Sequence, residues 1–268
     1  MHAQNTPETP CRALQGTQIL VLFAENAPLE RLALALSLRE MGSSELYFGK
    51  GEWTFAPEEF TYGELAVACA VGGLDLASLE QLGALCPCPL FNCGGPDANP
   101  ARLLADMALM RQTRPDLSNT RIAWLGGASG LAHSLIEAAM YVPFELFMAL
   151  PEWGEPNREL LALAFSAGAK IFLTREAHMA VDGAHFVYAG STQDAAATGR
   201  KPDAITAGML VDSSIMSMAA PEARLMAGQE GRLCVEPDLW SIHAAFARER
   251  LAMRLRVQRW LWNWLLAE

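Results

Sequence analysis

Short apolar runs alternate with segments of helical spacing along the first part of the chain. Residues 17–24 (TQILVLFA) are aliphatic and β-branched without polar alternation, which is typical of a strand buried on both faces of a parallel sheet. Residues 29–41 repeat apolar side chains three and four apart, which predicts a helix with Gly42 as its candidate C-cap. The same reasoning predicts further strands over 45–48, 65–71 and 89–92, and further helices over 76–85 and 101–114.

The alternation begins again after Pro115, which ends the helical pattern before it. The predicted elements are strands over 120–125, 144–149, 170–174 and 185–189, helices over 131–140 and 158–167, further β structure over 205–217 and 231–235, and helix from 241 to the end. Strands that alternate with helices at this spacing indicate parallel sheets with right-handed crossovers. The sequence therefore predicts an α/β fold with two parallel-sheet domains joined near residue 116.

The composition narrows the class of protein. With 51% hydrophobic and 19% charged residues, the 268-residue chain does not have the composition of a disordered protein. Its 20 Lys+Arg against 30 Asp+Glu give a net charge of -10, which argues against a nucleic-acid partner. No run reaches the roughly 18 apolar residues of a membrane span, and the N-terminus lacks the charged and apolar regions of a signal peptide. We therefore predict a cytoplasmic protein that binds neither nucleic acid nor membranes.

Three cysteines, Cys86, Cys88 and Cys93, cluster in the segment ALCPCPLFNC. A structural zinc site needs four ligands, commonly in paired C-x-x-C spacings, and this segment has neither. Small side chains packed in a strand and a loop are the favoured interpretation. We predict no metal site.

The glycine-rich turn 126–130 follows a predicted strand and opens a helix, as a dinucleotide-binding turn would. Its spacing is G-G-x-x-G instead of G-x-G-x-x-G, and no acidic residue ends the next predicted strand. A tight turn is therefore the favoured interpretation. The chain also has no P-loop, no H-E-x-x-H and no G-x-S-x-G motif, and we predict no cofactor.

The order of these segments resembles that of the ornithine/aspartate carbamoyltransferase family, with the ornithine branch the nearer. The resemblance covers residues 14–268 and rests on LQGTQILVLF, REMGS, FNCGGPDANPARLLADM, NTRIAWLGGASGLAHSLIEAA, the segment around Pro221 and the terminal ARERLAMRLRVQRWL. It implies the transcarbamylase fold, with carbamoyl phosphate and an amino acid as ligands. It also implies a homotrimer, or a complex with an active transcarbamylase. The implied parts are a flexible N-terminus over 1–13, a carbamoyl-phosphate-binding-like domain over 14–115, an amino-acid-binding-like domain over 116–240, and a terminal helix over 241–268 that packs on the first domain.

In that family a Ser-x-Arg-Thr-Arg motif at a helix N-terminus holds the phosphate of carbamoyl phosphate. The matching residues here are Ala27, Pro28, Leu29, Glu30 and Arg31, and only Arg31 keeps an arginine of the motif. Glu30 places a negative charge where a phosphate would sit. At ~4 Å that contact is repulsive by about 1–4 kcal/mol for each pair of unit charges, depending on the local dielectric.

The resemblance implies three further positions of the carbamoyl-phosphate site. A family arginine after the third strand falls near Ala70, and an arginine that reaches the carbamoyl oxygen falls on Arg250. The family's His-Pro-x-Gln, which polarises the carbamoyl carbonyl, falls on the stretch from Asn99 to Arg102. Asn99 can donate a hydrogen bond but cannot titrate, whereas Arg102 adds a positive charge. Asp106 matches a family position that we expect to be structural.

The motifs of the family's amino-acid site are also altered. The Gly-Asp-x-x-Asn turn falls on residues 126–130, where both the Asp and the Asn are absent. The Asp and the Ser-Met-Gly loop of the ornithine branch are absent after the predicted strand 185–189, and only the proline remains of its His-Cys-Leu-Pro loop. The implied amino-acid-site positions are Gly127, Gly130, Gly190, Met218, Ala219 and Ala220.

These replacements leave two classes of function open. The leading hypothesis is a carbamoyltransferase-family protein that is catalytically impaired and acts as a non-catalytic subunit or a binding or regulatory protein, because several charge-stabilising groups are replaced together. The alternative is an active ornithine carbamoyltransferase, which makes citrulline and phosphate, or a transferase for another acceptor. Its rebuilt site would use Arg31, Asn99, Arg102 and Arg250.

Overall fold

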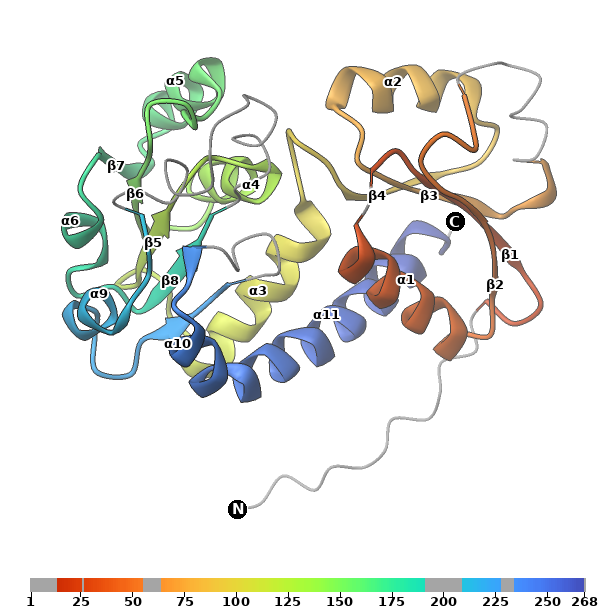
Figure 1. The fold of residues 1–268 in the computed structure, drawn as a ribbon. Helices are drawn as coiled ribbons and strands as arrows, with labels where there is room; N and C mark the ends of the chain where they lie inside the picture. The colour runs from red at the N-terminus through yellow and green to blue at the C-terminus, as the bar shows by residue number, and fades with distance from the viewer. Residues whose placement is uncertain (1–13, 26, 55–63, 191–208, 228–233, 268) are drawn as a thin grey trace. The chain divides into compact units, whose positions relative to one another are not determined.

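The structure is a computed structural model with two compact units. It describes residues 14–25, 27–54, 64–190, 209–227 and 234–267. The segment 1–13, which we predicted to be flexible, lies outside these residues. Unit 1 comprises Met1–Gly95 with Arg254–Glu268, and unit 2 comprises Pro96–Met253. Each unit contains one parallel sheet, which confirms the predicted fold class (Figure 1).

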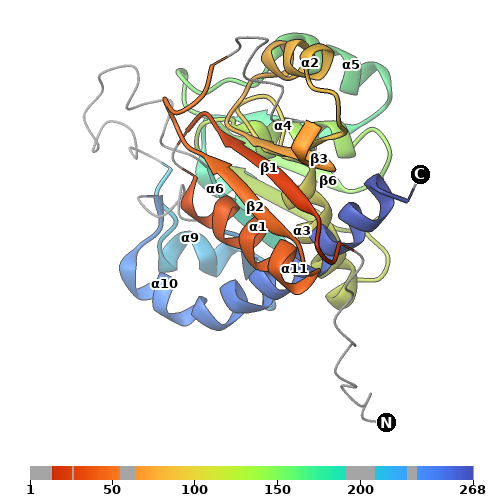
Figure 2. The same cartoon turned by 90° about the vertical axis from the view of Figure 1, so that its right-hand side faces the viewer.

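Unit 1 is built around a sheet of four parallel strands. Its elements are β1 (Gln18–Phe23), α1 (Pro28–Glu40), β2 (Ser44–Phe48), β3 (Ala68–Gly72), α2 (Leu76–Leu85), β4 (Leu90–Gly94) and the last turns of α11 (Ala244–Leu265). The strand order is β2-β1-β3-β4, with α1 on one face and α2 on the other (Figures 1 and 2). On the α2 face, Leu20, Leu22 and Val71 pack with Leu82 of the helix. Because both faces are covered, β1 reads as a continuous apolar run.

The last turns of α11 pack within unit 1. Trp262 is fully buried, and its ring stacks on Phe91 with 4.4 Å between the centroids. Arg259 Nη1 donates to Glu40 Oε2 at 2.6 Å, which ties the helix to the end of α1. These contacts explain why residues at the far end of the chain belong to the first unit.

Unit 2 is built around a sheet of five parallel strands. Its elements are α3 (Pro100–Thr113), β5 (Arg121–Leu125), α4 (Gly130–Ala138), β6 (Glu145–Ala149), α5 (Arg158–Ser166), β7 (Lys170–Thr174), α6 (Ala177–Val181), β8 (Phe186–Ala189), α9 (Ser213–Met218), β9 (Arg224–Leu225), α10 (Pro237–Ile242) and the first turns of α11. The strand order is β7-β6-β5-β8-β9. Ala123, Leu125 and Val187 pack with α6 on one face, whereas the stacked rings of Trp124 and Tyr188 lie on the other.

The division between the units differs from the predicted boundary at residue 116. It falls between Gly95 and Pro96, so that α3 belongs to unit 2. The hydrogen bonds of α3 explain the difference. The Asn99 N–H donates to Ser134 Oγ, and the Tyr188 hydroxyl donates to Asp106. The break in the sequence pattern at Pro115 follows the end of α3 and does not coincide with the division between the two units.

The β structure predicted over 205–217 is confirmed only at Val211, which forms an isolated bridge, and was wrong over 213–217. Residues 205–208 lie outside the described part, and Ser213–Met218 form α9. Asp212 caps this helix, since its Oδ1 accepts from the Ile215 N–H at 2.7 Å. Of the second predicted segment, 231–233 lie outside the described part, and Val235 forms an isolated parallel bridge with Val211. Local capping overrode the apolar pattern that suggested a strand.

Candidate functional site

The residues that match the family's phosphate motif lie at the N-terminus of α1, directly after β1. Ala27 is the N-cap, and Pro28 begins the helix without an N–H to donate. Glu30, in the first turn, accepts a hydrogen bond from Arg254 Nη2 at 2.9 Å. The two side chains are only 17% and 11% exposed, respectively. The carboxylate therefore already offsets the positive end of the helix dipole.

Two neighbouring residues complete this corner of unit 1. The Arg31 guanidinium carbon lies 3.7 Å from the centroid of the Tyr47 ring, and the residue is exposed. Leu29 is half-buried. The motif residues are thus held together on one helix end, and Arg31 is the one among them that carries positive charge.

Ala70 occupies a different environment. It is fully buried within β3, where it pairs with Val21 on one side and Phe91 on the other. The strand continues to Gly72, so the predicted site position near Ala70 falls inside the sheet and not in the loop beyond it. Ala70 is therefore a core residue of unit 1.

Asn99 acts as the N-cap of α3. Its Oδ1 accepts from the Arg102 N–H at 3.3 Å, and its own N–H donates to Ser134 Oγ at 2.9 Å. Asn99 and Arg102 are 9% and 8% exposed. The side chain expected to polarise a carbonyl thus already satisfies a helix end.

Arg250 lies in a buried hydrogen-bond network of unit 2. Its Nε and Nη2 donate to the two carboxylate oxygens of Asp106 at 3.1 and 2.8 Å, and its Nη1 donates to the Ala227 carbonyl at 2.7 Å. The Tyr188 hydroxyl donates to the same carboxylate at 3.1 Å. Burial would lower the pKa of Arg250, but Asp106 raises it above the usual value, so the guanidinium stays charged. Asp106 is thus the buried partner of Arg250.

The sequence did not indicate that Tyr188 belongs to this network. Unfolding at alkaline pH tests its contribution to stability. Burial first, and then the Asp106 carboxylate, raise the pKa of Tyr188 well above its usual 10.0. The folded pKa exceeds the unfolded one, so this contribution to stability is complete below pH ~10 and is lost as the pH rises further. We expect the free energy of unfolding, measured with urea, to fall by up to about 1.4 kcal/mol per pH unit. Tyr188→Phe should flatten that dependence, whereas Tyr141→Phe, at a 79% exposed position, should keep it. An unchanged pH dependence in Tyr188→Phe would contradict this assignment.

Gly127 and Gly190 meet where β5 and β8 end. A Cβ on Gly190 would lie 2.9 Å from the carbonyl oxygens of Leu125 and Gly127. Gly154 approaches the same turn so closely that a Cβ there would lie 2.4 Å from the Gly127 Cα. Three chain segments therefore cross here with backbone against backbone, which only glycine allows.

Trp124 fixes the conformation of this glycine turn. Its Nε1 lies 3.3 Å from the Gly126 carbonyl oxygen and 3.2 Å from that of Gly127, and donates to both. Gly126 has a φ of +115°, and Gly130 begins α4. These contacts agree with a tight turn, as the sequence indicated, because the turn's carbonyls are used inside the unit.

Three predicted positions lie at the amino end of β8, whereas Gly190 follows its carboxyl end: Met218, Ala219 and Ala220. The Met218 carbonyl accepts from the Gly183 N–H, and the Ala220 N–H donates to the Ala184 carbonyl, both at 3.0 Å. These contacts occur before β8 begins, whereas Gly190 follows its end. The structure therefore does not bring the three residues to Gly190, because the chain enters β9 only after them.

A loop follows β9 at the same end of the sheet as Gly190. The Met226 N–H donates to the Val187 carbonyl at 2.7 Å, and the Ala227 carbonyl accepts from Arg250. The strand itself has two residues, Arg224–Leu225, which is too short for a periodicity signal. It is recognised as a strand because it pairs with β8 in the sheet.

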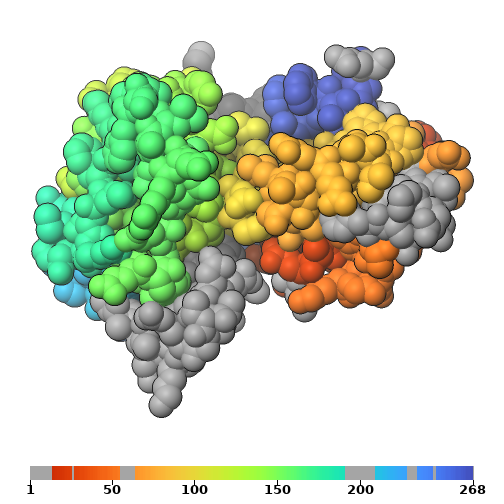
Figure 3. All heavy atoms as spheres, turned by 90° about the horizontal axis from the view of Figure 1, so that it is seen from above, coloured from red at the N-terminus to blue at the C-terminus, as the bar shows by residue number. Residues whose placement is uncertain are grey.

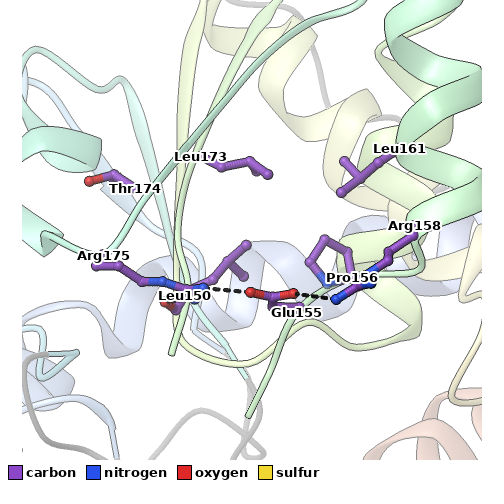
Figure 4. A pocket seen from close by; sticks show the side chains of 8 residues that line it. All are labelled: Leu150, Glu155, Pro156, Arg158, Leu161, Leu173, Thr174 and Arg175. Carbon is purple, nitrogen blue, oxygen red and sulfur yellow. Dashed lines mark hydrogen bonds and ion pairs between the residues drawn. The ribbon is translucent and has the colours of Figure 1, made fainter. Parts of the chain in front are cut away.

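A pocket of about 230 Å³ opens at the carboxyl ends of β6 and β7 (Figure 4). Arg175 Nη1 donates to the Leu150 carbonyl at 2.8 Å, and its Nη2 donates to Glu155, which Arg158 approaches at 3.7 Å. The hydrogen bond from Arg175 lowers the pKa of Glu155. Both guanidiniums thus face the Glu155 carboxylate. The sequence did not indicate this pocket because its residues come from α5, β7 and the loops after β6 and β7. It is lined by Leu150, Glu155, Pro156, Arg158, Leu161, Leu173, Thr174 and Arg175.

Two further kinds of feature are absent from the described part of the chain. No group of three or more His, Cys, Asp or Glu side chains there is placed to hold a metal ion. No helix there combines the length and the apolar character needed to cross a membrane.

Comparisons with known proteins identify the family. Residues 118–228 match the model of the aspartate/ornithine carbamoyltransferase Asp/Orn-binding domain. The chain is 31% identical to an ornithine carbamoyltransferase of Nitratidesulfovibrio vulgaris, over 96% of this chain and 89% of that one. It is 32% identical to an ornithine carbamoyltransferase of Oleidesulfovibrio alaskensis, over 94% and 88% of the two chains. An anabolic ornithine carbamoyltransferase of Campylobacter jejuni has the same fold, with a TM-score of 0.83 and 19% identity over 95% of this chain and 89% of that one. The chain belongs to the aspartate/ornithine carbamoyltransferase family.

Proposed function

We propose that this protein is an ornithine carbamoyltransferase homologue that does not turn over carbamoyl phosphate at ordinary enzymatic rates. In this proposal it acts as a binding or regulatory protein, or as a non-catalytic subunit. The observation that carries the proposal is the Glu30–Arg254 ion pair at the N-terminus of α1. A negative side chain with its own internal cation occupies the helix end where the family motif would hold a phosphate.

The physical argument is one of charge and donors. A helix N-terminus binds phosphate through free N–H groups and its positive dipole end. Here Pro28 removes one donor, and Glu30 offsets the dipole. A phosphate at ~4 Å from Glu30 would be repelled by about 1–4 kcal/mol per charge pair, depending on the local dielectric. The positive charge of Arg254 is already engaged with Glu30.

Other matched positions support the same proposal. Arg250 is held by both oxygens of Asp106, and the Asn99 side chain caps α3. Redirecting either group toward a ligand would leave a buried partner without its hydrogen bond, which costs about 1–3 kcal/mol for neutral groups and more for charged ones. The groups that would stabilise a transferring carbamoyl group are thus used for structure.

A second candidate is an active ornithine carbamoyltransferase, and the comparisons favour it. Relatives with that name are 31–32% identical over nearly the whole chain. In this proposal Arg31, Arg102 and Arg250 would supply the positive charge of a rebuilt site, with Asn99 as hydrogen-bond donor. The reaction would transfer the carbamoyl group to L-ornithine, or to another amine acceptor.

Ligands, assembly and location follow as parts of the same proposal. We propose that the protein binds carbamoyl phosphate or an amino acid, as the family does. We further propose that it assembles as a homotrimer or with an active transcarbamylase, and that it resides in the cytoplasm. Light scattering of the purified chain, alone and with an active relative, tests the assembly.

Citrulline formation from carbamoyl phosphate and L-ornithine separates the two candidates. We expect turnover below about 1 per second, because the phosphate position carries the Glu30 charge. The measurement is a colorimetric citrulline assay on the full chain, with an active ornithine carbamoyltransferase as the positive control. Turnover of about 1–10³ per second would reject the first candidate and support the second.

A matched pair of variants locates the effect on the molecule. Glu30→Gln removes the charge at the helix end, whereas Glu80→Gln removes an exposed charge on α2. Equilibrium dialysis with inorganic phosphate should show about tenfold tighter binding for Glu30→Gln, since 1.4 kcal/mol corresponds to a factor of ten. Glu80→Gln should leave the affinity unchanged. Equal affinities in both variants would show that the Glu30 charge does not weaken phosphate binding.

A further inference from the structure

Three cysteine side chains gather at the amino edge of the unit 1 sheet. Cys69 lies in β3, Cys86 is the C-cap of α2, and Cys88 follows two residues later, before β4. The Sγ atoms of Cys86 and Cys88 are 3.5 Å apart. Cys69 is held next to this pair because its N–H donates to the Pro89 carbonyl at 2.9 Å. Two thiols that are two residues apart in the sequence thus face each other beside a third.

The contacts make the three thiols unequal. Hydrogen bonds from Cys69 and then Cys88 lower the pKa of Cys86 to about 3. The hydrogen bond to Cys86 and burial raise the pKa of Cys69 and of Cys88. Of the three, Cys86 is therefore the thiol whose contacts favour the thiolate, whereas those of Cys69 and Cys88 favour the protonated form. A thiolate, and not a thiol, is the nucleophile in sulfur chemistry.

The pair is accessible, whereas the third thiol is not. Cys86 and Cys88 are half-buried, and Cys69 has no exposed surface. Helix α2, in gold, lies at the surface of unit 1 in Figure 3, and Cys86 follows its last residue. A small reagent can thus reach Cys86 from solvent, whereas Cys69 hydrogen-bonds to Cys86 from the core.

We propose that Cys86 and Cys88 form a thiol–disulfide exchange site that low-molecular-weight disulfides oxidise to an intramolecular disulfide. The Cys86 thiolate attacks one sulfur of the reagent, its S–S bond breaks, and one small thiolate leaves. Cys88 then loses its proton to solvent and attacks Cys86 Sγ, which expels the second small thiolate. Two cysteine thiols are oxidised, and one reagent disulfide is reduced to two thiols.

The geometry favours formation of the Cys86–Cys88 disulfide over other reactions of the mixed disulfide. The Sγ atoms must approach from 3.5 Å to about 2.05 Å, a change that rotation of two half-buried side chains can supply. Cys88 lies nearest in sequence, so the mixed disulfide on Cys86 meets an intramolecular thiol at once. Among the described residues no metal-binding group includes these cysteines.

Treatment of the full chain with oxidised glutathione, followed by peptide mass mapping, tests the proposal. We expect a Cys86–Cys88 disulfide, seen as the loss of two hydrogen atoms from their shared peptide. Cys88→Ser should stop at a glutathione adduct on Cys86. Cys86→Ser should react at least about tenfold more slowly, because the thiolate is removed.

Cys234→Ser is the matched control, since this buried thiol lies in unit 2. It should oxidise at the parent's rate and give the same linked peptide. The proposal is overturned if Cys86 and Cys88 both stay reduced in the parent, or if Cys86→Ser reacts as fast as the parent. Peptide mapping of the oxidised parent chain shows whether Cys86 and Cys88 stay reduced, even where a variant folds poorly.

Discussion

Asp106→Asn should lower the free energy of unfolding of unit 2 by about 3–5 kcal/mol, the range seen when one partner of a buried ion pair is removed. Asp106 is 4% exposed and accepts from two Arg250 nitrogens and from Tyr188. The asparagine keeps the shape of the side chain but loses the charge, so a buried guanidinium is left without compensation. Urea unfolding followed by near-ultraviolet circular dichroism measures the change, because the Trp124 and Tyr188 rings stack in this network.

The control for this variant is Asp182→Asn. Asp182 lies 4.0 Å from Arg121, and its side chain is 79% exposed. An exposed pair contributes about 0–1 kcal/mol, so this variant should unfold close to the parent. Equal effects of the two substitutions would show that the buried network does not depend on the Asp106 charge.

Gly154→Ala should be the second most damaging change, with a loss of about 1–3 kcal/mol or more. The new Cβ would lie 2.4 Å from the Gly127 Cα, and the backbone there cannot move independently of β5 and β6. Thermal unfolding of the full chain measures the effect. The substitution strains the glycine crossing directly, without removing any hydrogen bond.

Gly83→Ala is the matched glycine control. Gly83 lies inside α2, and a Cβ there would meet only the Leu90 Cδ1, at an ordinary 3.6 Å. Alanine is favoured over glycine in helices by about 0.5–1 kcal/mol, so this variant should unfold at a slightly higher temperature. A parent-like Gly154→Ala would mean that the turn can open without cost.

Most of the fold could be predicted because its signals are local. The helix over Leu76–Leu85 has the bounds that we predicted, and β1 and α1 begin and end within one residue of their predicted bounds. The errors arose where local signals compete or vanish. Asp212 caps a helix where apolar residues suggested a strand, and β9 is too short to show a period. The sequence pattern therefore predicted no strand at β9.

The sequence by itself determined the fold class and the order of most elements. Tertiary structure alone decided what the remaining charged residues do. Glu30 pairs with Arg254 across 224 positions, and Asp106 pairs with Arg250 across 144. Periodicity and capping act within a few residues and can be read along the chain. Pairing of buried charges depends on which elements pack together, and no local pattern records it.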